Sequence, residues 1–162
     1  KAGENVNVFD MVIGRTSGTI GETSMIAIVF GACILILMGI IDLRIPGSYI
    51  VTFVVFITLF GGRGFDPYFI SAHLAGGGLM LGAFFMATDY TTCPINKKGK
   101  LVFGIGCGLI TFVIRVFGAL PEGVSFSIIL MNILVPHIEN LSAAKPFGTL
   151  KEKKSKKEEK KA

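Results

Sequence analysis

The sequence lacks the signatures of a soluble enzyme's active site. Its three cysteines, Cys33, Cys93 and Cys107, are widely separated, so no CxxC spacing supports a zinc site or a local iron–sulfur cluster. Neither of the two histidines, His73 and His137, has a second metal ligand three or four residues away, which argues against a metal site. Gly-rich phosphate loops, nucleophile elbows and catalytic triads are also missing, so soluble-type catalysis is not supported.

Charged residues are scarce outside the C-terminal end of the chain. The formal net charge of +5 raises the question of nucleic-acid binding, but most of it comes from "KEKKSKKEEKKA" at residues 151–162, with seven Lys and three Glu. A run of this composition is typical of a disordered, solvated tail. We therefore expect a disordered Lys-rich cytoplasmic tail over residues 142–162 and no nucleic-acid partner.

Long apolar blocks make up most of the remaining sequence. The chain of 162 residues is 51% apolar, and the apolar residues come in blocks rather than at alternating or helical spacing. A bilayer core about 30 Å thick is crossed by roughly 20 apolar helical residues, so the fold class expected is all-α, a polytopic membrane helix bundle. Within residues 25–141 we predict five transmembrane helices, at about 25–41, 46–61, 69–88, 101–117 and 124–138.

Positive charge in the short loops predicts how this bundle lies in the bilayer. The loops "DLR" at 42–44 and "NKKGK" at 96–100 fall on the same side as the Lys-rich tail if there are five spans. Lys and Arg are enriched in cytoplasmic loops, whereas the opposite loops hold one Arg each, balanced by Asp66 and Glu122. We expect a multi-pass protein of the cell (inner) membrane, with residues 1–24 outside and the C-terminus in the cytoplasm.

Two acidic helix starts are expected on the outer side. "TIGETS" places Glu22 in the first turn of the first span, and "PEGVSFSI" places Glu122 at the start of the fifth. Free N–H groups and the helix dipole favour an anion there, so capping is one explanation. Irregular backbone that lines a cavity is the other. The outer candidates are Thr19, Gly21, Glu22, Thr23, Pro121, Glu122 and Gly123.

A second polar group is expected on the inner side, where the third span ends in "MATDYTTCP". Asp89 with Thr88 and Thr91 is a candidate for the edge of an inner cofactor or ion pocket. Arg115, near the end of the fourth span, has three open interpretations: snorkelling to the interface, a pair with Glu122, or contact with an anionic cofactor.

Glycine-rich stretches are expected to lie where helices pack closely. They are "AGGGLMLGA" at 75–83 and "GIGCG" at 104–108. Small residues let helix backbones approach each other, and a flat ligand ring held against the glycines is the alternative explanation.

Three stretches carry a family resemblance. "SGTIGETSMIAIVFGACILI", "FFMATDYTTCPINKKGK" and "GLITFVIRVFGALPEGVSFSIILMNILVPHIE" resemble, in order and spacing, the C-terminal half of the RnfD/NqrB family between Asp10 and Asn140. These proteins are membrane subunits of Rnf complexes and of sodium-pumping NADH:quinone reductases. "DYTTCP" and the compact "NKKGK" loop are more similar to the Rnf member, the membrane-embedded D subunit of the Rnf ion-translocating ferredoxin:NAD oxidoreductase complex.

The resemblance implies a fold and a cofactor. The fold would be the second five-helix inverted repeat of a urea-transporter-like ten-helix fold, so the chain would be half of a longer one. Family members carry FMN linked to a Thr in a Ser-Gly-Ala-Thr motif, and some carry a riboflavin as well. Ser17-Gly18-Thr19 lacks the Ala of that motif. The covalent attachment Thr is therefore expected upstream of residue 1, and the outer candidates would border the flavin ring.

The resemblance also implies a function. The chain would be a flavin-carrying membrane subunit of an ion-pumping redox complex that passes electrons between ferredoxin and NAD, coupled to Na⁺ or H⁺ export. It would be a component of a translocase, not catalytic alone. The expected partners are other Rnf membrane subunits, the outer-side flavin subunit and the lipid bilayer. The alternatives are a small-solute transporter or channel of urea-transporter-like fold and a scaffold without cofactor.

Overall fold

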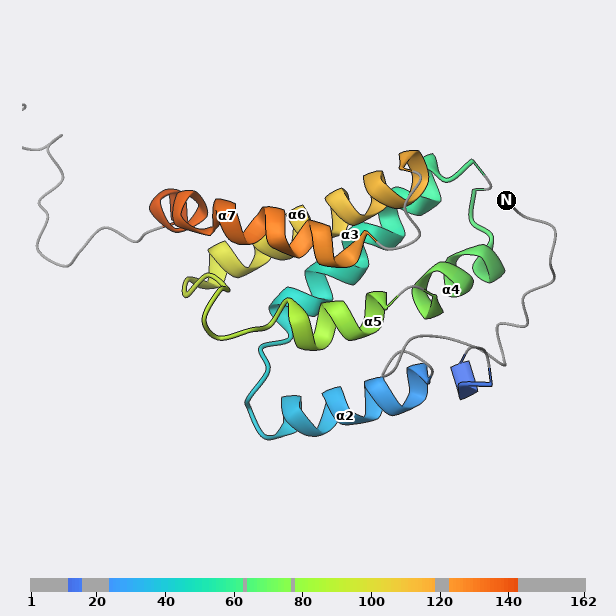
Figure 1. Ribbon diagram of the computed structural model, residues 1–162, viewed down its shortest axis with the longest axis horizontal. Helices are drawn as coiled ribbons and strands as arrows, with labels where there is room; N and C mark the ends of the chain where they lie inside the picture. The colour runs from blue at the N-terminus through green and yellow to red at the C-terminus, as the bar shows by residue number, and fades with distance from the viewer. Residues whose placement is uncertain (1–11, 16–23, 63, 77, 119–122, 143–162) are drawn as a thin grey trace, which may run out of the picture.

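The computed structural model describes residues 12–15, 24–62, 64–76, 78–118 and 123–142. Within these residues all regular structure is helical. The helices form an elongated bundle (Figure 1). Their bounds are α2 Met25–Leu37, α3 Arg44–Phe60, α4 Pro67–Ala75, α5 Leu79–Leu81, the π-helix η1 Gly82–Met86, α6 Lys97–Phe117 and α7 Val124–Ser142.

Local sequence explains where several helices begin and end. The Ser24 hydroxyl accepts the Ala27 backbone N–H at 3.4 Å and caps α2. Asp66 accepts the Tyr68 N–H at 3.1 Å, with Pro67 in the first turn of α4. The chain leaves α2 at Gly39, whose φ of +72° is accessible to glycine at little cost. As a result α2 ends at Leu37, four residues before the predicted end of the first span.

The third predicted span is not one continuous helix. It divides into α4 and the pair α5–η1, and the two parts are bent by 67°. Gly76 ends α4, and Gly78 before α5 has φ +62°. The glycine run that predicted close packing therefore also breaks the helix, because glycine loses more conformational freedom in a helix than any other residue.

Two helices of the described chain, α6 and α7, are long and apolar enough to cross a membrane, and the bent pair adds a third if it counts as one span. The apolar helices α2 and α3 are shorter, with 13 and 17 residues. Helix α6 begins at Lys97 and α7 runs through Pro136 to Ser142, so both exceed their predicted bounds. The five-span topology stays a prediction, and tail residues 143–162 lie outside the described residues.

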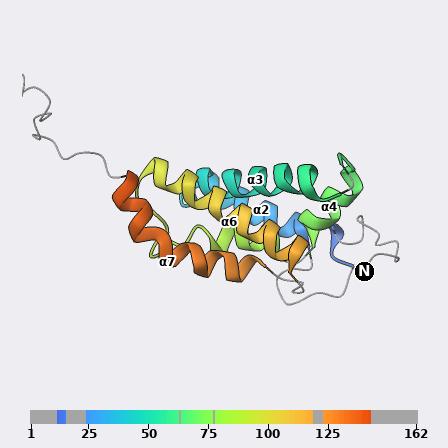
Figure 2. The same cartoon turned by 90° about the horizontal axis from the view of Figure 1, so that it is seen from above.

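The core lies where α6 packs between α3 and α7 (Figure 2). The largest buried side chains there are aromatic, namely Tyr49, Phe53 and Phe103. Helix α2 lies at one side of the bundle, next to α5 (Figure 1), and only Ala32 of its residues is buried. The outward faces of α2, α3, α6 and α7 are rich in apolar residues, as expected of helices that face lipid or other apolar helices.

Candidate functional site

Two glycines of α6 bring its backbone against α3. A Cβ atom at Gly104 would lie 2.7 Å from the carbonyl oxygen of Ile45, and one at Gly108 would lie 2.6 Å from that of Tyr49. These are glycines four residues apart on one helix face, the spacing that allows close helix contact in membranes. The packing interpretation of "GIGCG" is therefore confirmed, and this contact fixes the register between the polar side chains of α3 and α6.

Three hydroxyl groups meet in the core where α3, α6 and α7 come together. Thr111 donates to the Ser127 hydroxyl at 2.8 Å, and Ser127 donates to the Val124 carbonyl at 2.7 Å. The Tyr49 hydroxyl lies 2.5 Å from the Thr111 oxygen and 3.3 Å from that of Ser127. Because each hydroxyl has one proton, Tyr49 must donate to Thr111. All three residues are fully buried, and the chain of donors satisfies each of them.

The hydroxyl cluster of Tyr49, Thr111 and Ser127 did not emerge from sequence reasoning. Helices α3 and α7 carry other polar residues besides Tyr49 and Ser127, among them Thr52 and Asn132, and the cluster exists only once the register of three helices is known. The usable signal was the presence of a hydroxyl residue in each of three largely apolar blocks.

One turn further along α6, Arg115 reaches across to α4. Its Nη1 donates to the His73 carbonyl at 2.7 Å and its Nη2 to the Gly76 carbonyl at 3.1 Å. The guanidinium carbon lies 5.5 Å from the centre of the buried Phe53 ring of α3. The three interpretations that the sequence left open for Arg115 stay predictions, since Glu122 lies outside the described residues. A cation thus binds one carbonyl in the last turn of α4 and that of the residue that follows the helix.

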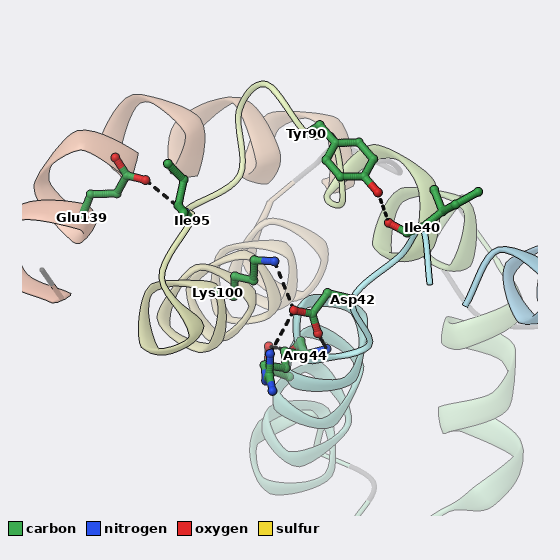
Figure 3. Close-up of polar contacts among 8 residues, drawn as sticks. Ile40, Asp42, Arg44, Tyr90, Ile95, Lys100 and Glu139 are labelled. Carbon is green, nitrogen blue, oxygen red and sulfur yellow. Dashed lines mark hydrogen bonds and ion pairs between the residues drawn. The ribbon is translucent and has the colours of Figure 1, made fainter. Parts of the chain in front are cut away.

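A polar cluster joins the N-terminal ends of α3 and α6, at the end of the bundle away from Arg115. Asp42 Oδ2 lies 3.1 Å from both Arg44 Nη1 and Lys100 Nζ (Figure 3). Partial burial raises the pKa of Asp42, but the Arg44 N–H and the Lys100 ammonium outweigh it and hold the pKa below its ordinary 3.8. The loops predicted to share one membrane side, "DLR" and "NKKGK", therefore lie at the same end of the bundle.

The connection between η1 and α6 is fastened at the same end. The Tyr90 hydroxyl donates to the Ile40 carbonyl, and the Ile95 N–H donates to Glu139 Oε1 of α7 at 3.0 Å (Figure 3). Asn96 also donates to the Ser142 hydroxyl at 3.4 Å. This loop thus contacts both the α2–α3 turn and the end of α7.

The inner candidates, Thr88, Asp89 and Thr91, are engaged locally. Thr88 donates to the Phe84 carbonyl at 2.6 Å. Asp89 is exposed and accepts from the Thr91 hydroxyl at 2.5 Å. The hydroxyl and N–H of Thr91 lower the pKa of Asp89. The described contacts pair these side chains with their own segment, and their place at the edge of an inner cofactor or ion pocket stays a prediction.

Of the outer candidates, Gly123 lies within the described residues. Thr19, Gly21, Glu22, Thr23, Pro121 and Glu122 lie outside the described residues. Gly123 is buried just before α7, and a Cβ atom there would lie 2.9 Å from Cβ and Cγ2 of Ile114. Close packing against α6 is therefore sufficient to explain glycine at this position.

Comparison with known proteins gives consistent family matches. The model of the NQR2, RnfD, RnfE family matches residues 1–148. The D subunit of the Na⁺-translocating ferredoxin:NAD⁺ oxidoreductase complex of Acetobacterium woodii is 45% identical over 95% of this chain and 48% of its own length. The D subunit of the proton-translocating complex of Clostridium ljungdahlii is 43% identical over 86% of this chain and 42% of its own.

A third relative has a more general name. The D subunit of the ion-translocating oxidoreductase complex of Stutzerimonas stutzeri is 40% identical over 84% of this chain and 39% of its own length. The chain thus spans about half the length, or less, of the curated relatives it matches. The resemblance inferred from the three sequence motifs is confirmed, and the chain belongs to the NQR2, RnfD, RnfE family.

Proposed function

We propose that this chain is part of a flavin-carrying membrane protein, the D subunit of a complex that passes electrons between ferredoxin and NAD and exports Na⁺ or H⁺. The observation that carries the proposal is the 45% identity, over 95% of the chain, to a protein named as that subunit. The other membrane subunits of such a complex and its outer-side flavin subunit are the proposed partners.

The physical character of the bundle supports this function. Where a cofactor carries electrons, the protein supplies binding, orientation and exclusion of water and needs no acid or base of its own. The described core is apolar apart from the satisfied hydroxyl cluster and Arg115. The chain would accordingly surround part of the cofactor site within the bilayer. Its proposed fold is the second five-helix inverted repeat of a urea-transporter-like ten-helix fold.

The ion is left open within this proposal. Two relatives of nearly equal identity are named for different ions, sodium at 45% and protons at 43%. Among the described residues, no group of three or more His, Cys, Asp and Glu is placed to hold a metal ion. Overall similarity therefore does not choose between Na⁺ and H⁺.

For the cofactor, we propose covalent FMN attached to a Thr upstream of residue 1, with riboflavin as a second flavin. The residues proposed to border a flavin are the outer candidates, most of which lie outside the described residues, and the inner group around Asp89, whose polar atoms hydrogen-bond within their own segment. When bound, the flavin would supply the one-electron steps that protein side chains lack.

Fluorescence on a denaturing gel tests the flavin proposal. The natural polypeptide containing this sequence should fluoresce under ultraviolet light, and its Thr19→Ala and Thr23→Ala variants should fluoresce equally, because the attachment Thr lies elsewhere. Protein staining of the same lanes controls for loading.

Two results would contradict the flavin proposal. Loss of fluorescence in Thr19→Ala would place the attachment site within this chain. A dark wild-type band would remove the covalent flavin and favour the solute transporter.

A further inference from the structure

Helix α4, the first half of the broken segment, ends in carbonyl groups that accept hydrogen bonds from a side chain of α6. The last carbonyls of a helix have no partner within it and carry the negative end of the helix dipole. The carbonyls of His73, in the last turn of α4, and of Gly76, the residue that follows α4, both accept hydrogen bonds from the Arg115 guanidinium, at 2.7 and 3.1 Å. The same guanidinium lies over the Phe53 ring, so three elements, α3, α4 and α6, meet at this one charge.

Carbonyls of this kind attract cations. In membrane proteins with discontinuous helices, half-helix C-terminal ends and unwound carbonyls coordinate transported cations. Here the two carbonyls are engaged by a cation that is covalently part of α6 and cannot dissociate. A fixed arginine also creates an electrostatic barrier that repels free cations.

We propose that Arg115 acts as a tethered cation that closes the carbonyl end of the broken α4–α5 segment to free monovalent cations. Removing its charge exposes a carbonyl site and lowers the barrier to cation passage, so that the resting protein leaks Na⁺. The proposal requires only that the bundle lies in a membrane. It does not depend on a flavin or on electron transfer.

The test uses the full-length protein in its complex, reconstituted in sealed vesicles without any electron donor or acceptor. Radioactive sodium uptake is measured for wild type and for Arg115→Gln, which keeps hydrogen-bond donors but loses the charge. Uptake should rise about tenfold or more, because a unit charge within a few ångströms of a cation site contributes several kcal/mol even at an effective dielectric constant of about 20. Arg115→Lys keeps the charge and should stay close to wild type.

Two controls separate charge from packing. Arg44→Gln removes an exposed arginine at the other end of the bundle, where Lys100 still pairs with Asp42, and should not leak. Arg115→Ala should leak, and added guanidinium ion should suppress that leak by occupying the vacated carbonyls.

Several outcomes would overturn the proposal. Equal leak in Arg115→Lys and Arg115→Gln would mean that lost packing, not lost charge, opens the segment. Wild-type uptake in Arg115→Gln and Arg115→Ala would mean that the guanidinium closes nothing. Failure of both neutral variants to assemble, even with guanidinium present, would make Arg115 a structural residue only. Loss of redox activity in Arg115→Gln with Na⁺ uptake at the wild-type level would also contradict the closure of the segment by Arg115. It would not contradict the proposed redox function.

Discussion

Replacing Gly108 with alanine is expected to destabilise the bundle by about 1–3 kcal/mol, the usual cost of overpacking a tight core. The new Cβ atom would lie 2.6 Å from the Tyr49 carbonyl oxygen and 2.9 Å from Thr52 Cβ. One of these neighbours is backbone, so relief requires moving α3 away from α6. The shift would also separate Tyr49 from Thr111. Thermal unfolding of the purified protein in detergent would measure the loss.

The matched control for Gly108→Ala is Gly47→Ala on the facing helix. A Cβ atom at Gly47 meets nothing within 4 Å, and no positive φ applies there. Alanine should therefore be neutral or stabilise α3 by roughly 0.5–1 kcal/mol through its higher helix propensity. Equal unfolding temperatures for the two variants would contradict the close-contact account of the α3–α6 interface.

Thr111→Val is expected to cost about 1–2 kcal/mol, because two buried hydrogen bonds are lost and one is replaced only by a longer contact. Valine has nearly the same shape, but it takes away the near acceptor of the Tyr49 hydroxyl, which keeps only the Ser127 oxygen at 3.3 Å, and it takes away the donor to Ser127. Both partners are fully buried, so water does not replace the lost bonds. The midpoint of thermal or denaturant unfolding in detergent is the measurement.

The position of each residue in the donor chain predicts an order of effects. Tyr49→Phe should cost less than Thr111→Val, because it removes the first donor and leaves the Thr111 and Ser127 bonds intact. The double variant should cost less than the sum of the single variants, since residues in one hydrogen-bond network couple. Strict additivity, or a larger effect of Tyr49→Phe, would contradict the network.

The sequence predicted the helical class, the approximate positions of the helices and the family. Apolar blocks are a strong signal, because a bilayer requires long runs of apolar residues. The close contact at Gly104 and Gly108 was also predictable, since small residues at this spacing serve few other purposes in an apolar helix. Helix ends were less accurate, and Leu37 and Ser142 show errors of four residues in opposite directions.

The contacts of the interior were not predictable from the sequence. The hydroxyl cluster depends on the rotation of three helices about their axes, which composition does not specify. The break at Gly76 and Gly78 was interpreted as packing, because a glycine run serves either purpose. The contacts of Arg115 with the His73 and Gly76 carbonyls were also not predicted, because these carbonyls become available only where α4 ends.

The proposed redox and transport function is tested most directly in membrane vesicles from cells with and without the gene that encodes this chain. The account predicts that electron transfer from reduced ferredoxin to NAD, and the Na⁺ or H⁺ movement it drives, are both lost without the gene and both restored by the wild-type copy. Dissipating the ion gradient should not abolish electron transfer in the restored vesicles. Unchanged electron transfer and ion movement in vesicles that lack the protein would contradict the account.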